Sequence, residues 1–315
     1  MEQPELNEQS INQPGDVNGT QAAAPPVANN TATVLHQQVS PVTCSSCGAA
    51  ADANGNGATA PSYVFAIGRV EMRFPSLAVE KEFAQATGRA DTKGLTDRAA
   101  AHAVLSTRAN RYIARQVCWV FTIEGMETYI LVPRDPADYD QLLEAVRPQP
   151  SPLDLDVVVG LRGPIAPPGM CNGLMVPIVL FDQIYSFDRD ALIKAIPRPE
   201  KTTAKEFGPA AEELFDRIMF AADNAGSTDD HRALNYLAVR YPAIYATAAE
   251  AFGRNSSLTA VDVQASRLSG TRRIVDVVLS FTNRITDVVE KFFTRVDVTE
   301  EFPFLVTKIS PYYDR

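Results

Sequence analysis

The sequence predicts a protein of the α+β class, with mixed or antiparallel sheets, helices packed on one face, and an antiparallel meander at the C-terminus. Three observations lead to this prediction. Residues 1–60 have the composition of an unfolded segment, so the fold is expected in the remainder. In residues 61–197, strand-like runs alternate with amphipathic helical runs. In residues 198–315, helical runs come first and strand-like runs follow, an order typical of α+β proteins.

Residues 1–60 differ in composition from the rest of the chain. They contain five acids but no lysine, arginine or aromatic residue. Such a segment buries too little apolar surface to offset its ordering entropy, so we expect a disordered acidic tail. The whole chain of 315 residues has a net charge of −9, yet 33 acidic and 29 basic residues remain outside the tail, a net of −4. More than half of the acidity therefore belongs to the tail.

The first half of the body begins with strand and helix signals in turn. Residues 63–70 have the composition of a strand, and the helical pattern that starts at Ser76 ends at Gly88. Thr96 is a suitable N-cap for a helix that runs to about Arg108. These signals predict one strand followed by two helices.

A hairpin is predicted next. Residues 111–123 alternate between apolar and polar positions, Glu124-Gly125-Met126 forms a short turn, and residues 127–132 return as a strand. Asp135-Pro136 then provides an N-cap and a proline at the first helical position, which predicts a helix to about Val146.

The remaining strands of the first half surround a loop rich in proline and glycine. Residues 153–161 alternate and place Asp154 and Asp156 on one face of a strand. We interpret this face as the solvent-exposed face of an edge strand, and not the two residues as a catalytic carboxylate pair. The loop at 163–173 separates this strand from an apolar run at 174–187. A short helix capped by Asp188 precedes a proline-rich boundary near residue 197.

The second half is expected to contain three helices and a meander. Apolar residues in 210–222 recur at helical spacing, Thr228 caps a second helix, and Pro242 starts a third. The strand-like runs that follow are 258–266, 272–283, 286–298 and a shorter one at 302–309. We expect the two halves to form one compact unit.

Composition and motifs exclude several classes of function. The charge balance argues against a nucleic-acid module that works by bulk positive charge. No apolar run is long enough for a membrane span, and the N-terminus lacks a signal peptide, so a cytoplasmic protein is expected. No nucleotide-binding glycine loop occurs, and the three histidines lack the spacing of a zinc hydrolase. We therefore expect no enzymatic activity.

The four cysteines carry the main chemical signal. Cys44 and Cys47 form a CxxC that precedes Gly48, a pattern typical of a metal knuckle. With Cys118 and Cys171 they would complete a tetrahedral four-thiolate zinc shell, which is structural because no coordination position stays open. In a reducing compartment, thiols or metal ligands are expected in preference to disulfides.

Other interpretations of the cysteines stay open. Cys44 and Cys47 could be idle thiols or a reversible redox pair, and Cys118 could be a small buried hydrophobe. Alternatively, Cys171 could be the reactive thiol of an unrecognised enzyme, with Arg162 and Asp182 near it. Several arginines near loops or strand ends could also hold peptide carboxylates or form surface ion pairs: Arg69, Arg73, Arg111, Arg115, Arg134, Arg162 and Arg240.

Four stretches of the body resemble one known family. They are YVFAIGRVEMRFPSLAVEKEFAQ (63–85), RYIARQVCWVFTIEGMETYILVPRDPADYDQLLEAV (111–146), DVVVGLRGPIAPPGMCNGLMVPIVLFDQIYSFD (156–188) and DHRALNYLAVRYPAIY (230–245). They are similar to the C-terminal domain of unknown function of the PatG and PatA cyanobactin maturation proteases, in its free-standing version. The resemblance implies a non-catalytic accessory or scaffold protein in ribosomal peptide maturation, which binds a precursor peptide or a modifying enzyme, contains zinc and forms a homodimer. The subtilisin-like protease domain of those enzymes is missing from this sequence.

Overall fold

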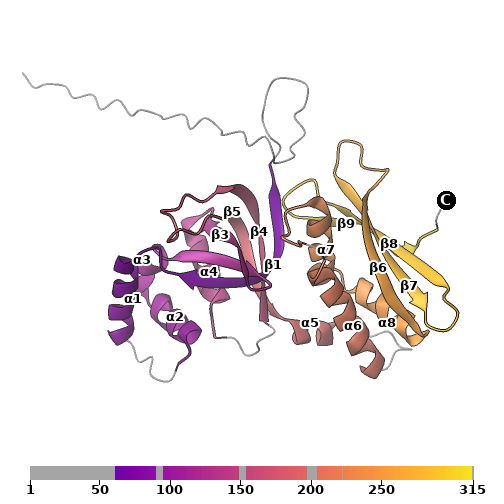
Figure 1. The fold of residues 1–315 in the computed structure, drawn as a ribbon, viewed down its shortest axis with the longest axis horizontal. Coiled ribbons are helices and arrows are strands. Elements are labelled where there is room, and N and C mark those ends of the chain that lie inside the picture. Colours follow the sequence, from indigo (N-terminus) through magenta and orange to yellow (C-terminus); the bar gives the residue numbers. More distant parts are fainter. Residues whose placement is uncertain (1–60, 90–94, 149–153, 197–203, 222, 314–315) are drawn as a thin grey trace, which may run out of the picture. The chain divides into compact units, whose positions relative to one another are not determined.

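The computed structural model describes residues 61–89, 95–148, 154–196, 204–221 and 223–313. Residues 58–315 form one compact unit, whose described residues are coloured in Figure 1. The predicted tail at 1–60, including Cys44 and Cys47, lies outside the described residues.

The first half of the chain forms a closed five-stranded barrel. Its strands follow the order β1-β2-β3-β5-β4, and β4 closes the barrel by pairing with β1. All neighbours are antiparallel except β3 and β5, which are parallel. The strands are β1 (Tyr63–Arg73), β2 (Cys118–Ile123), β3 (Met126–Pro133), β4 (Asp154–Ile165) and β5 (Pro177–Asp188).

The prediction of an edge strand around Asp154 and Asp156 is wrong. Strand β4 pairs with β1 on one side and with β5 on the other, and both carboxylates are buried. Asp156 accepts hydrogen bonds from the backbone N–H of Val70 at 2.8 Å and from the Ser186 hydroxyl at 2.5 Å. Burial raises the pKa of Asp156, although these two hydrogen bonds and the nearby Arg98 oppose the rise. This carboxylate therefore joins three strands instead of facing water.

The β2–β3 hairpin is confirmed, but the predicted strand at 111–123 is too long. Residues 108–114 are helical, and the strand begins only at Cys118. Glu124 (φ 52°) and Gly125 (φ 77°) form the two-residue turn. Both positive φ values match a type I′ turn, whose twist suits the strands that it joins.

Short helices cover one side of the barrel. Apolar side chains from these helices pack with Trp119, Phe121 and Leu131 of the barrel in one core cluster. The half-buried Arg98 guanidinium donates to the carbonyls of Val70, Ala145 and Arg147, and thereby links two of the helices to β1. The helical segments are α1 (Leu77–Arg89), α2 (Asp97–Ser106), η1 (Arg108–Asn110), α3 (Arg111–Ala114), η2 (Pro136–Asp138) and α4 (Tyr139–Ala145).

The second half confirms the predicted order of helices followed by a meander. Each strand pairs antiparallel with the next, in the order β6-β7-β8-β9. Helix α5 (Arg189–Ala195) ends the first half. The helices of the second half are α6 (Ala204–Met219), α7 (Asp229–Arg240) and α8 (Ala243–Gly253), and its strands are β6 (Ser256–Ala265), β7 (Ile274–Asn283), β8 (Val289–Asp297) and β9 (Phe304–Pro311). The α+β fold class is therefore confirmed.

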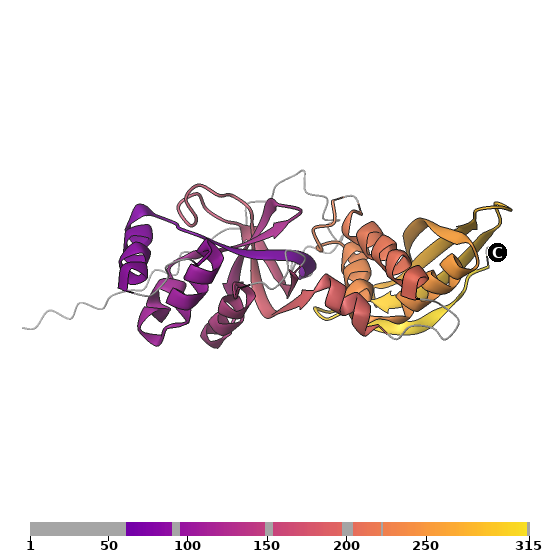
Figure 2. The same ribbon diagram turned by 90° about the horizontal axis from the view of Figure 1, so that it is seen from below.

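Helices α6, α7 and α8 lie between the barrel and the meander (Figures 1 and 2). Alternation along β1 explains how one strand serves two cores. Val64 and Ala66 face the core of the barrel, whereas Phe65 and Ile67 pack with these helices and with β7.

None of the described helices has the length and apolar character needed to span a membrane.

Two buried asparagines connect the barrel to α7. Asn224 and Asn235 donate to each other at 2.8 and 3.1 Å, and the Asn235 amide also donates to the Phe65 carbonyl at 2.9 Å. The Phe65 N–H donates to the carbonyl of Gly226 at 2.9 Å. Gly226 has φ +67°, and a Cβ there would lie 2.4 Å from the Phe65 oxygen. Only glycine fits this junction without displacement of the backbone.

Candidate functional site

The structure brings two of the four predicted metal ligands together. Cys118 begins β2 and Cys171 lies in the loop between β4 and β5, 53 residues later, with the Cα atoms 5.8 Å apart. Both side chains are buried and pack in a small cluster with Val120 and Ile130. They form a disulfide, whereas the sequence predicts thiolates at these positions. Cys44 and Cys47 lie outside the described residues, and the described residues contain no group of three possible metal ligands.

The cysteine pair fits half of a four-thiolate site. A Cα separation of 5.8 Å lies within the range of disulfides, and two cysteines this close can also face one ion when reduced. Oxidation and metal binding exclude each other, because a zinc ligand must be a thiolate. The geometry of the body therefore permits either state.

The loop proposed for an unrecognised enzyme does not gather its three predicted residues. Cys171 is fully buried and bonded to Cys118, and Arg162 is exposed. Asp182 instead forms an ion pair with Arg134. Within the described part of the chain, no hydrogen bond or ion pair joins Asp182 to either of the other two. The burial of Cys171 thus shields its sulfur from any substrate in solution.

Asp182 belongs to a charged cluster that sequence reasoning missed. Arg134, just after β3, pairs with Asp182 of β5 and, at 3.2 Å, with Glu301 of the loop between β8 and β9. Burial, and secondly the neighbouring Asp182 carboxylate, raise the pKa of Glu301 to about 7. The cluster connects the barrel to the meander loop. No local motif reveals it, because the three residues lie far apart in sequence.

A second arginine holds the same loop. Arg232 of α7 is 1% exposed and donates to the carbonyls of Val298 (2.7 Å), Glu300 and Glu301. Its guanidinium also lies over the ring of Tyr63, 5.3 Å from the centroid. Burial lowers its pKa to about 10, so the group keeps its charge at neutral pH.

Most of the arginines singled out in the sequence take part in local contacts. Arg73 pairs with Glu127 and Arg111 pairs with Asp140. The Arg240 guanidinium lies over a tyrosine ring of β5 at 4.6 Å. These contacts favour the interpretation as ion pairs and stacking over a dedicated carboxylate site.

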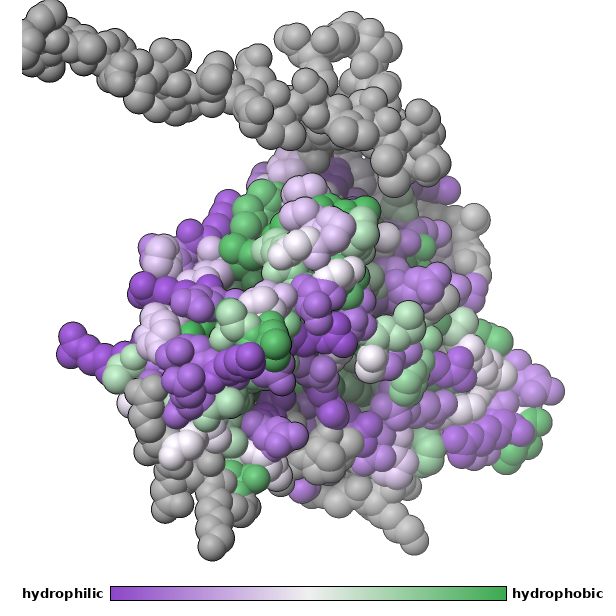
Figure 3. Space-filling view, turned by 60° about the vertical axis from the view of Figure 1, so that its left-hand side comes forward, coloured by the Kyte–Doolittle hydropathy of each residue, from purple (hydrophilic) through white to green (hydrophobic). Residues whose placement is uncertain are grey.

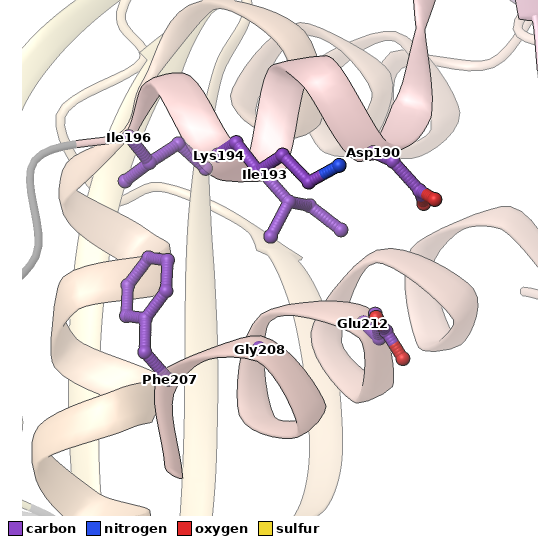
Figure 4. A pocket seen from close by; sticks show the side chains of 7 residues that line it. All are labelled: Asp190, Ile193, Lys194, Ile196, Phe207, Gly208 and Glu212. Atoms are coloured by element: carbon purple, nitrogen blue, oxygen red, sulfur yellow. The ribbon is translucent and has the colours of Figure 1, made fainter. Parts of the chain in front are cut away.

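A cavity of about 490 Å³ lies between α5 and α6 (Figure 4). Figure 4 shows Phe207 of α6 pointing towards Ile196, with Ile193 between the two helices. The charged residues at its border are Asp190, Lys194 and Glu212. The segment that joins its two walls, 197–203, lies outside the described residues.

Two adjoining cavities lie between the β2–β3 hairpin and the end of α6. Their volumes are about 350 and 340 Å³, and Glu124, Met219 and Phe220 line both. We call this surface the hairpin groove. Met126 and Phe220, which both line this groove, are 73% and 69% exposed. Figure 3 shows small apolar patches among polar residues on one face of the molecule.

Comparisons with known proteins agree with the resemblance noted in the sequence. Residues 201–312 match the family described as PatG C-terminal. A solved structure titled "PatG Domain of Unknown Function" is similar to this chain with a TM-score of 0.65 and 22% sequence identity, over 80% of this chain and 98% of that chain. Comparison with curated proteins gives no significant match. Residues 201–312 therefore match the PatG C-terminal family, and this chain shares the fold of the PatG domain of unknown function.

Proposed function

We propose that this protein is a non-catalytic accessory or scaffold protein of cyanobactin-like peptide maturation, which binds a precursor peptide or a modifying enzyme and acts as a homodimer. The observation that carries the proposal is the match of residues 201–312 to the PatG C-terminal family, together with the shared fold. The burial of Cys171 supports a non-catalytic role, because the proposed nucleophile is closed to solvent.

We also propose that Cys44, Cys47, Cys118 and Cys171 hold a structural zinc ion when they are reduced. The proximity of Cys118 and Cys171 supports this, since zinc sites need ligands that converge on one point. A bound zinc ion would supply folding free energy and no open coordination position.

Thiol titration tests the metal proposal directly. Protein purified under reducing conditions should expose few reactive thiols until a chelator removes the metal, after which four should react. Metal analysis should give one zinc per chain, and Cys118→Ser should lower that content. Two thiols that react only after reduction would assign Cys118 and Cys171 to a permanent disulfide and contradict a four-cysteine site. One thiol that reacts rapidly in the untreated protein would favour the alternative that the protein is an enzyme with a reactive cysteine.

Calorimetry tests the peptide-binding role. A precursor peptide of the cyanobactin type should release or absorb heat when it is titrated into the full-length protein. Peptide-modifying enzymes of cyanobactin maturation serve as a second set of titrants. If neither the peptide nor any of these enzymes binds at high micromolar concentration, the accessory role is wrong. Sedimentation analysis of the same sample measures whether the protein is a dimer.

A further inference from the structure

The hairpin groove combines exposed apolar side chains with preformed cavities. Met126 lines the second cavity and Phe220 lines both, yet both side chains remain mostly exposed. Met219 adds a second flexible thioether side chain, which adapts to apolar ligands of different shape. Large apolar residues around a concavity are typical of binding surfaces. Because the cavities adjoin in a row, an elongated ligand fits them better than a compact one.

The charged residues of the groove are mainly acidic. Four carboxylates and two guanidinium groups line it: Glu71, Glu124, Asp216, Asp223, Arg69 and Arg189. Arg189 pairs with Asp216 at 3.1 Å, and Glu71 accepts a hydrogen bond from Thr122 at 3.3 Å. Among the described residues, no ion pair engages the carboxylates of Glu124 or Asp223. A ligand with positive charge would complement these two carboxylates.

Both of these acids lie on tight turns with positive φ. Glu124 has φ 52° in the hairpin turn, and Asp223 has φ 54° in the turn after α6. Both residues line the second cavity, which contains no basic residue. A backbone already held in a tight turn costs less ordering entropy when a cation binds to the carboxylate that it carries.

We propose that the hairpin groove binds a peptide segment in which apolar side chains adjoin lysine or arginine. This inference rests on the proposed peptide-binding role and adds the site and the chemistry of the segment. The apolar side chains would occupy the cavities around Phe220, and the cation would lie near Glu124 and Asp223. Residues 1–60 of this chain do not match these requirements, because they contain five acids and neither a basic nor an aromatic residue.

Fluorescence anisotropy with three labelled synthetic peptides tests the proposal on the full-length protein. One peptide alternates Leu and Lys, the second alternates Leu and Glu, and the third alternates Ser and Lys. Only the Leu/Lys peptide should bind well. The variant Phe220→Ser should weaken it about tenfold or more, as expected for an aromatic anchor. The double variant Glu124→Gln/Asp223→Asn should weaken it by roughly two- to tenfold, with less dependence on salt.

Matched variants control for general effects. Phe302→Ser removes another half-exposed phenylalanine, and Glu250→Gln removes an exposed carboxylate of α8. Both should bind the Leu/Lys peptide like the parent protein. Asparagine tolerates positive φ, so Asp223→Asn keeps its turn, and a thermal melt of each variant verifies folding.

Several outcomes would overturn the groove assignment. If the Leu/Glu or Ser/Lys peptide binds as tightly as the Leu/Lys peptide, the proposed combination of apolar and cationic recognition is wrong. The assignment is also wrong if the groove variants bind the Leu/Lys peptide with the affinity of the parent protein. Self-association that Phe220→Ser abolishes would assign the groove to a second copy of this chain. If the natural precursor binds but the groove variants leave its affinity unchanged, the proposed function stands and the groove assignment fails. If only the Leu/Lys peptide binds, the groove stands and the precursor role fails.

Discussion

The barrel and the meander reach a stable sheet by different routes. In the meander each strand pairs with the next one along the chain, so β6 to β9 need only short connections. In the barrel, β1 pairs with β4, for example Phe65 with Val159, and β3 pairs in parallel with β5. Such pairs close long loops and depend on the complete fold. The closed barrel has no open edge, whereas β6 and β9 end the described meander.

Buried polar side chains contribute to the junction between the two regions. The Asn224–Asn235 pair joins α7 to β1, and Arg232 together with Arg134 ties the meander loop to the rest of the molecule. A buried polar network stabilises only when all of its partners are present. We therefore expect substitutions at the junction to destabilise the protein more than substitutions on either outer surface.

A large effect is expected at Arg232. Replacement by Met should lower the free energy of unfolding by about 3 kcal/mol, because the carbonyls of Val298, Glu300 and Glu301 lose a charged donor. Urea denaturation measures this loss. The control Arg254→Met breaks an exposed pair with Glu290 and should cost at most about 1 kcal/mol. Equal losses in both variants would show that the junction contributes no more to the free energy of unfolding than an exposed ion pair.

Two glycines with positive φ provide a matched test of the junction. Gly226 and Gly270 have φ +67° and +53°, but only at Gly226 would a Cβ meet other atoms within 4 Å. Alanine at either position should cost about 1–2 kcal/mol from backbone strain. Gly226→Ala should cost roughly a further 1–3 kcal/mol from overpacking against Phe65 and Ala66. Similar melting temperatures for the two variants would contradict the close packing of this junction.

The smallest effect concerns pH. The pKa of Glu301 is raised to about 7 in the folded protein from an ordinary value of 4.5, so the folded state holds the proton more tightly. Its contribution to stability is therefore complete below pH 4.5 and is lost as the pH rises through 7. The Glu301→Gln variant should not lose this stability. Its stability relative to the parent protein should therefore increase as the pH rises between these two values. The control Glu290→Gln, at an exposed site, should show a flat difference in thermal melts across the same range.

The sequence predicted the meander well because its signals are local. Four strand-like runs gave four strands with small shifts at their ends, and Thr96, Asp135, Asp188 and Thr228 all cap helices as expected. Alternation along residues 117–123 also separated the two faces of β2 correctly: Trp119 and Phe121 pack in one core, and Cys118 and Val120 in another.

The errors arose where distant segments decide the structure. The buried position of Asp156 follows from the pairing of β4 with both β1 and β5, which no local pattern encodes. The same holds for the cluster of Asp182 with Arg134 and Glu301, and for the hairpin groove. The residues at 111–114 alternate like a strand, yet they are helical and pack into the core of the barrel through Ile113. Tertiary packing overrides the local pattern there.

Hydrogen–deuterium exchange with and without the natural precursor peptide tests the central claim most directly. The claim is that the protein is a peptide-binding accessory protein whose hairpin groove receives the peptide. Amide protection should increase in residues 123–128 and 216–225, with little change in the meander strands β7 and β8. Protection confined to the meander, or no change at saturating peptide, would contradict the claim.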